Sequence, residues 1–238
     1  MTAADPITAL PPIVSREEWL AARMDLLAQE KELTRQRDRV SAARRRLPMV
    51  EVTETYVFQG EHGPVTLLDL FGGRSQLIVQ HFMFSDDQDH ICAGCSMMAD
   101  YLGPAEHLHA RDTSLALISR GSIDTLQAYR QRMGWDHPWF SSGGSGFNED
   151  FGYTRDGEDH PGVSTFLRVD DRVYHTWSTH NRGAEYVMGA LHLLDLTALG
   201  RQEEWEESPA GWPQSPNGSW WRLRDEYGSK PEEHGCCH

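Results

Sequence analysis

The sequence has few cysteines, no long apolar run and little positive charge, and each shortage excludes a class of protein. Four cysteines in 238 residues are too few for a disulfide-stapled scaffold. A membrane-spanning helix needs about 18 or more consecutive apolar residues, and no stretch of this sequence is nearly that long. Lys and Arg number 22 against 36 Asp and Glu, so the formal net charge is -14, and a nucleic acid would be repelled overall. We therefore expect neither a membrane nor a nucleic acid as a partner.

The remaining composition indicates a folded chain. Hydrophobic residues make up 39% and aromatic residues 10%, whereas disordered chains are poor in both. Residues 1–12 have neither the basic region nor the apolar region of a secretory signal, so we expect a cytoplasmic protein. We divide it into an N-terminal extension with a helix at 1–50, a central domain at 51–200 and an irregular tail at 201–238.

A long amphipathic helix is predicted over residues 15–47. Ser15 and Glu18 have the spacing of a capping box, and the helix should end at Leu47 because the residue before Pro48 disfavours helical geometry. Apolar residues recur at every seventh position, at Trp19, Leu26, Leu33, Val40 and Leu47. This pattern is typical of a helix laid across its own domain, and it also fits a coiled-coil homodimer.

Strand and helix patterns alternate through the central domain. The predicted elements, in order, are a hairpin at 56–67, an apolar strand at 76–84, a helix from residue 92 to 102, a strand at 114–119, a helix at 123–133, a loop at 135–162, an edge hairpin at 163–177 and a helix at 184–196. The alternation predicts a mainly parallel sheet with right-handed crossovers. A loop as long as 135–162 is usually functional.

Cys92 and Cys95 form a CxxC motif at the expected start of a helix. The helix dipole and N-terminal amides stabilise a thiolate there, so Cys92 can attack a disulfide. Cys95 lies one turn later and can resolve the mixed disulfide. A CxxC can also be half of a zinc site, so one alternative is a metal site with His90 as a nearby ligand. The other alternative is that the two cysteines have no shared function.

Several stretches together resemble a known family much more specifically than CxxC does. They are 56–58 (YVF), 67–71 (LLDLF), 80–84 (QHFMF), the CxxCS motif at 92–96, 132–135 (RMGW), 138–142 (PWFSS), 147–152 (FNEDFG), 174–179 (YHTWST), 193–197 (LLDLT) and 225–227 (DEY). In these stretches the chain resembles the bacterial thioredoxin-like proteins catalogued as domain-of-unknown-function family 899, which are predicted dithiol-disulfide oxidoreductases.

The resemblance implies an α/β protein with a thioredoxin-like three-layer α/β/α fold, a long N-terminal helix and an irregular C-terminal extension. In thioredoxins a cis-proline faces the CxxC, whereas the corresponding place here reads GVST at 162–165. The resemblance places Val163, Ser164 and His175 along the substrate groove. A groove without that proline excludes metals less well, so copper or zinc on Cys92 and Cys95 with His90 or His175 stays open.

Two further groove candidates come from the residues themselves. Arg120 follows a predicted strand at the rim where open α/β sheets bind ligands, and it is a candidate for an anionic substrate. Trp139 is a candidate for the wall of an apolar pocket.

We expect a thiol-disulfide oxidoreductase with Cys92 and Cys95 as catalytic residues. It should need no cofactor, and its partners should be a thiol or disulfide substrate and an external thiol reductant. The alternatives are a copper- or zinc-binding protein, a thiol peroxidase using Cys92, and a module that binds a small ligand in an aromatic pocket. The tail Cys236-Cys237-His238 is a candidate for binding a soft metal or passing electrons to the main dithiol.

Overall fold

The computed structural model describes residues 10–87 and 91–228. The strands of its main sheet are β1 (Val50–Val52), β2 (Val57–Gly60), β3 (Gly63–Thr66), β4 (Gln76–His81), β5 (Thr113–Ser119), β6 (Trp139–Ser141), β9 (Gly162–Val169) and β10 (Arg172–His180), while β7 (Thr154–Arg155) pairs with β8 (Glu158–Asp159). The helices are α1 (Arg16–Arg44), η1 (Asp69–Phe71), α2 (Ala93–Asp100), α3 (Glu106–His109), α4 (Ile123–Met133), α5 (Phe147–Asp150), η2 (Asn181–Val187) and α6 (Gly189–Leu194).

The main sheet has the order β1-β10-β9-β4-β5-β6-β2-β3. Strands β4, β5 and β6 are parallel, whereas β9 pairs with β4 in the antiparallel sense and β10 follows as its hairpin partner. This arrangement of β4, β5, β9 and β10 is that of the thioredoxin-like fold, and the predicted fold is confirmed.

Two predictions about the sheet are wrong. The sheet is mixed rather than mainly parallel, because the β2–β3 hairpin and the β9–β10 hairpin add antiparallel strands on both sides of the parallel trio. The second hairpin does not form the edge either, since β1 pairs with β10 through the register Val50 to His175.

Alternating side chains of the central strands face two different layers. Leu77 and Val79 of β4 pack in one core cluster with η1 and α5, represented by Phe71 and Phe147. The opposite face, which includes Leu117 of β5, packs against α2 and α4. Helical segments therefore cover both faces, which gives the three-layer arrangement and places α2 on one face at the carboxyl end of β4.

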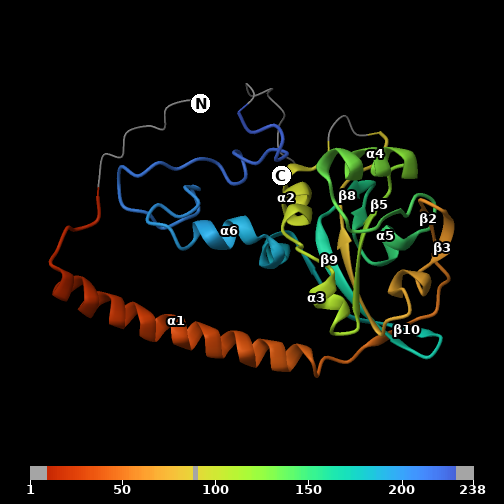
Figure 1. Ribbon diagram of the computed structural model, residues 1–238, viewed down its shortest axis with the longest axis horizontal. Helices are drawn as coiled ribbons and strands as arrows, with labels where there is room; N and C mark the ends of the chain where they lie inside the picture. The colour runs from red at the N-terminus through yellow and green to blue at the C-terminus, as the bar shows by residue number, and fades with distance from the viewer. Residues whose placement is uncertain (1–9, 88–90, 229–238) are drawn as a thin grey trace.

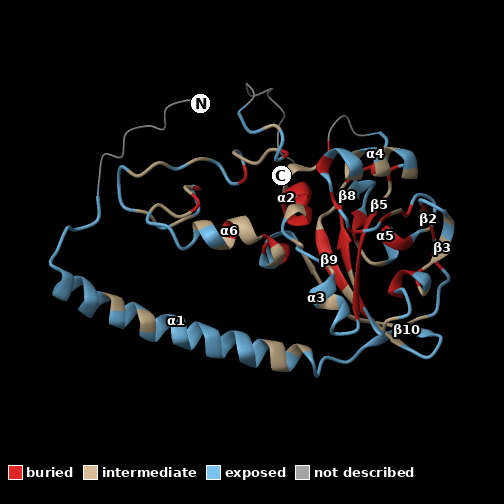
Figure 2. Cartoon of the chain, in the orientation of Figure 1, coloured by how far each residue is buried: buried red, intermediate tan, exposed pale blue. Residues whose placement is uncertain are grey.

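Helix α1 does not lie across its own domain, which corrects the first interpretation of its heptad pattern. Ser15 and Glu18 form the predicted capping box, but the helix runs away from the sheet (Figure 1). All of its residues are described and none is buried (Figure 2). It ends at Arg44, before the predicted Leu47, and there the Arg44 guanidinium lies 4.6 Å from the centroid of the Trp177 ring.

Other boundaries differ where local patterns were ambiguous. The apolar strand at 76–84 ends at His81, because the chain leaves the sheet toward α2. The predicted loop at 135–162 contains β6, α5, β7 and β8. The predicted helix at 184–196 divides into η2 and α6. Within the described ranges, no helix is long and apolar enough to cross a membrane.

Candidate active site

Cys92 is the N-cap of α2, directly after the loop that follows β4. Its Sγ accepts a hydrogen bond from the backbone N–H of Cys95 at 3.2 Å. Its carbonyl oxygen accepts hydrogen bonds from the Ser96 backbone N–H at 3.0 Å and from the Ser96 hydroxyl at 2.8 Å. The sulfur therefore occupies the position that a Ser or Asp oxygen takes at many helix N-termini.

The environment of Cys92 favours its thiolate form. The hydrogen bond from the Cys95 side chain is the main cause that lowers the pKa of Cys92, and the backbone N–H groups of Cys95 and Gly94 lower it further, while burial acts in the opposite direction. A thiolate is the nucleophilic form of cysteine, so these contacts favour the reactive form of Cys92.

Cys95 lies behind Cys92, buried with an exposed fraction of 1%. Its Sγ accepts a hydrogen bond from the Met83 backbone N–H at 3.5 Å, and its carbonyl oxygen accepts one from the Gln80 amide at 2.8 Å. Gln80 thus ties the first turn of α2 to β4. The half-buried Cys92 and the buried Cys95 have the relative exposure expected of an attacking and a resolving thiol.

A tryptophan from the C-terminal part of the chain covers the motif. The indole of Trp221 lies so close to Gly94 that a Cβ added there would be 2.7 Å from Trp221 Cζ3 and 2.9 Å from Cε3. Two residues later, Leu223 packs in the same core cluster as Cys95, and the Arg224 guanidinium pairs with Asp100 at 2.8 Å. Residues 221–224 therefore run along α2 from its first turn to its last residue.

A buried carboxylate fixes the tryptophan pair. Glu203 is fully buried and accepts hydrogen bonds from Trp220 Nε1 at 3.0 Å, from the Gly218 backbone N–H at 3.0 Å and from Trp205 Nε1 at 2.7 Å. Trp220 precedes Trp221 in the chain, so the buried carboxylate restrains the indole on Gly94.

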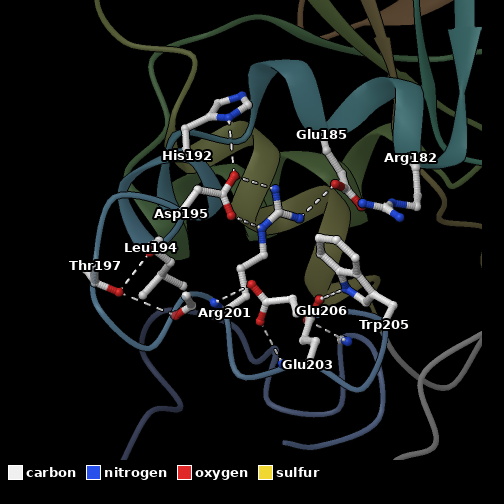
Figure 3. A network of polar contacts seen from close by, with 12 residues as sticks. Arg182, Glu185, His192, Leu194, Asp195, Thr197, Arg201, Glu203, Trp205 and Glu206 are labelled. Atoms are coloured by element: carbon white, nitrogen blue, oxygen red, sulfur yellow. Dashed lines mark hydrogen bonds and ion pairs between the residues drawn. The ribbon is translucent and has the colours of Figure 1, made fainter. Parts of the chain in front are cut away.

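An ion network anchors the start of the same region (Figure 3). The buried Arg201 guanidinium binds Asp195 through two hydrogen bonds of 2.7 and 2.9 Å and Glu185 through one of 2.8 Å. Residues 201–228, hereafter the C-terminal segment, are thus bound to η2, α6 and α2 at successive points.

The predicted groove residues do not gather around Cys92. Val163 is on the same side of the sheet as α2, but it is buried against Met97 and Met98. Ser164 faces the opposite layer, where its hydroxyl lies 2.9 Å from His81 Nε2 and donates to the Tyr153 hydroxyl at 3.1 Å.

His175 also lies in that opposite layer. Its ring contacts Phe151 and Phe166, and its Nε2 lies 3.1 Å from the Trp177 carbonyl oxygen. Burial lowers the pKa of His175. The structure does not bring it to the CxxC, because residue 175 pairs with Phe166 on the far face of the sheet.

Trp139 and Arg120 have structural partners. Trp139 is a core residue with 1% of its surface exposed, and its indole N–H donates to the Ser119 hydroxyl at 2.9 Å. The Arg120 guanidinium pairs with Asp159 at 2.7 Å. Neither residue offers its polar group to a ligand beside Cys92.

The metal alternative stays a prediction. Its proposed ligand His90 lies outside the described residues, as does the tail Cys236-Cys237-His238. In residues 10–87 and 91–228, no group of three or more His, Cys, Asp or Glu side chains is arranged to hold a metal ion.

Sequence reasoning missed Gln80, Glu203 and the role of Trp221. Gln80 gave a signal, since an amide inside an apolar strand requires a buried partner. Trp221 lies in the segment predicted as an irregular tail, and nothing in the sequence indicated its contact with Gly94. Glu203 gave no signal, because it lies in an acidic run typical of a solvated surface.

Comparisons with solved structures give distant likenesses. Xanthomonas campestris bacterioferritin comigratory protein, studied for alkyl peroxide reduction, has 11% identity, a TM-score of 0.47, and coverage of 62% of this chain and 96% of that chain. Peroxidoxin BcpB from Mycobacterium tuberculosis has 16% identity, a TM-score of 0.45, and coverage of 62% and 97%. The mitochondrial 2-Cys peroxiredoxin from Plasmodium falciparum has 11% identity, a TM-score of 0.41, and coverage of 60% and 92%.

A search of curated proteins finds no match. The model of a bacterial family, described as bacterial protein of unknown function (DUF899), matches residues 8–227. This match covers the helix α1, the sheet, the CxxC and the C-terminal segment, and it confirms the resemblance drawn from the sequence. The chain therefore belongs to the DUF899 family.

Proposed function

We propose that the protein is a thiol-disulfide oxidoreductase in which Cys92 attacks and Cys95 resolves. The observation that carries the proposal is the position of Cys92 at the N-cap of α2, with its Sγ accepting a hydrogen bond from the Cys95 N–H at 3.2 Å and its pKa lowered. Fixed donors directed at a sulfur stabilise the thiolate before any substrate arrives.

The reaction follows from the order of the two thiols. The Cys92 thiolate attacks one sulfur of the substrate disulfide, a mixed disulfide forms, and the other substrate sulfur leaves as a thiolate. Cys95 then loses its proton to solvent and attacks Cys92 Sγ, which releases the second substrate thiolate and leaves a Cys92–Cys95 disulfide. Two electrons pass to the substrate, and an external thiol reductant restores the dithiol.

The same geometry assigns different consequences to the two cysteines. Loss of Cys92 removes the nucleophile, so no mixed disulfide forms. Loss of Cys95 leaves a nucleophile without a resolving thiol, so a mixed disulfide accumulates. A metal site would behave differently, because both substitutions would remove ligands of one ion.

The test is carried out in a Cys236→Ser/Cys237→Ser background, so that the tail thiols do not react. The reduced protein and its Cys92→Ser and Cys95→Ser variants are mixed with a small aromatic disulfide and followed by mass spectrometry. We expect an internal disulfide in the parent, a stable adduct in Cys95→Ser and no adduct in Cys92→Ser. Equal adduct formation on both variants would refute the assigned roles.

Two companion measurements separate the alternatives. Elemental analysis of the purified protein should give copper and zinc far below one equivalent, whereas about one equivalent lost with Cys92→Ser would refute the oxidoreductase. The parent should react faster with the disulfide than with an alkyl hydroperoxide. The opposite preference would favour the thiol peroxidase.

A further inference from the structure

Helix α1 carries an exposed apolar surface that the other described residues, 10–87 and 91–228, leave uncovered. Six of its large apolar side chains are between 45% and 54% exposed, namely Trp19, Leu20, Met24, Leu26, Leu33 and Val40. No residue of this fully described helix is buried (Figure 2). Helices in proteins gain most of their stability from packing an apolar face, and the part of the chain that the structure describes supplies no such partner for α1.

Part of this surface forms a seam of seven-residue period. Trp19, Leu26, Leu33 and Val40 occupy one heptad position, and the positions three residues later hold Ala22, Gln29, Gln36 and Ala43. The two positions together form the contact stripe of a two-helix coiled coil. The stripe alternates between large apolar residues and smaller or polar residues.

The charges of α1 are divided about Leu33. Residues 16–32 contain three basic and five acidic side chains, whereas residues 34–44 contain four basic and one acidic side chain. Two parallel copies would place the two basic halves together. Two antiparallel copies place the acidic half of each helix beside the basic half of the other, which is favourable.

We propose that α1 forms an antiparallel coiled coil with α1 of a second copy of the chain, making the protein a homodimer. In this arrangement Trp19 packs against the partner's Ala43, and Leu33 packs against the partner's Gln29. Large residues meet smaller ones along the seam. A parallel pair would instead place Trp19 on the partner's Trp19 and Gln29 on the partner's Gln29.

The length of the helix suits a stable interface. Twenty-nine residues rising about 1.5 Å each give a helix of about 43 Å. A contact stripe about 10 Å wide then covers roughly 430 Å² on each helix, somewhat below the about 500 Å² per partner that is the lower limit for a biological interface. The seam therefore supplies most of that minimum area, before any contact of the central domains.

The first experiment compares seam and control substitutions by light scattering and sedimentation. Wild type should have twice the chain mass at micromolar concentration, and Leu26→Glu/Leu33→Glu should be monomeric, with the dimer dissociation constant raised at least about 100-fold. Ala21→Glu/Ala28→Glu adds the same charge on another face of α1 and should remain dimeric. A monomeric wild type, or equal loss of dimer in both variants, would overturn the proposal.

The second experiment tests the orientation. In the antiparallel pair Arg39 lies beside the partner's Asp25, so Arg39→Glu should weaken the dimer about tenfold, and Asp25→Arg in the same chain should restore it. In a parallel pair Arg39 would lie beside the partner's Arg44, and Arg39→Glu would strengthen the dimer. Strengthening, or failure of the rescue, refutes the antiparallel arrangement, and circular dichroism confirms that the variants keep the helix.

Discussion

Replacement of Gly94 by alanine tests whether Trp221 covers the CxxC as described. The new Cβ would lie 2.7 and 2.9 Å from two carbons of the indole, whereas carbon atoms pack at about 3.5 to 4.0 Å. The indole must therefore move by about 1 Å, against the hydrogen bonds that hold the neighbouring Trp220 to Glu203. Overpacking of this kind costs roughly 1 to 3 kcal/mol.

Once the indole is absent, Gly94→Ala should raise the free energy of unfolding rather than lower it. In a Trp221→Ala background, the alanine Cβ at position 94 meets no other side chain closer than 3.8 Å, and the helix gains the higher propensity of Ala over Gly, worth up to about 1 kcal/mol. The coupling between the two sites should therefore be about 2 to 4 kcal/mol, far above the about 0.5 kcal/mol scatter of independent sites.

Urea unfolding of the four proteins in this cycle measures the coupling, with Phe151→Ala in place of Trp221→Ala as the control. Phe151 lies in the layer on the other face of the sheet, against Phe166 and His175, so its cycle with Gly94→Ala should be additive. Equal destabilisation by Gly94→Ala in the presence and absence of Trp221 would show that the indole does not lie on the motif.

Three further predictions concern the thiol, the buried carboxylate and a buried histidine. The rate of Cys92 alkylation should rise with pH to a plateau whose midpoint lies below the usual thiol value of about 8.5, because hydrogen bonding lowers the pKa of Cys92, and a midpoint at or above it would contradict the site. Glu203→Gln should lower the unfolding free energy by about 1.5 to 3 kcal/mol in urea titrations, because an amide cannot accept all three hydrogen bonds, and an unchanged midpoint would refute the anchor. Burial holds the pKa of His81 well below the usual value in the native state. Below about pH 6.5 the unfolded chain therefore binds a proton at His81, whereas the native state leaves this imidazole neutral. Stability should therefore fall as the pH drops below about 6.5, by up to about 1.4 kcal/mol per pH unit for this group, and His81→Leu should show a shallower fall if the argument holds.

The sequence predicted those parts of the fold that depend on local patterns. The capping box at Ser15 and the helix at Ile123–Met133 are confirmed. The hairpin of β9 and β10 is confirmed as well, because the turn at Asp170 has a positive φ that suits its residue type. Each signal lies within one helix or one turn, so its prediction does not require knowing which distant residues are in contact.

The arrangement of the sheet and the groove depends on contacts between distant residues. Val163 and Ser164 are neighbours in β9, so their side chains point to opposite faces, and only one of them can share a layer with α2. His175 was assigned to the groove by its position in the chain, but its strand register places it opposite Phe166 in the far layer. A one-residue difference in register decides such an assignment, and sequence patterns do not define register that closely.

The GVST stretch at the place of the thioredoxin cis-proline begins with Gly162, which has no room for a side chain. A Cβ on Gly162 would collide with the Thr179 carbonyl oxygen and with the Tyr153 ring, so the strand begins with a backbone packed directly against an aromatic side chain. Within the described ranges there is no cis peptide bond. The indole of Trp221 lies instead against Gly94 of the CxxC, and it is held through Trp220 and Glu203 rather than by the sheet. Because the indole belongs to a segment outside the sheet, we expect the access of thiols to Cys92 to depend on how firmly that segment binds. Substitutions at Glu203 should consequently change which thiols reach Cys92, while the hydrogen bonds that lower its pKa, all of which come from within α2, stay as they are.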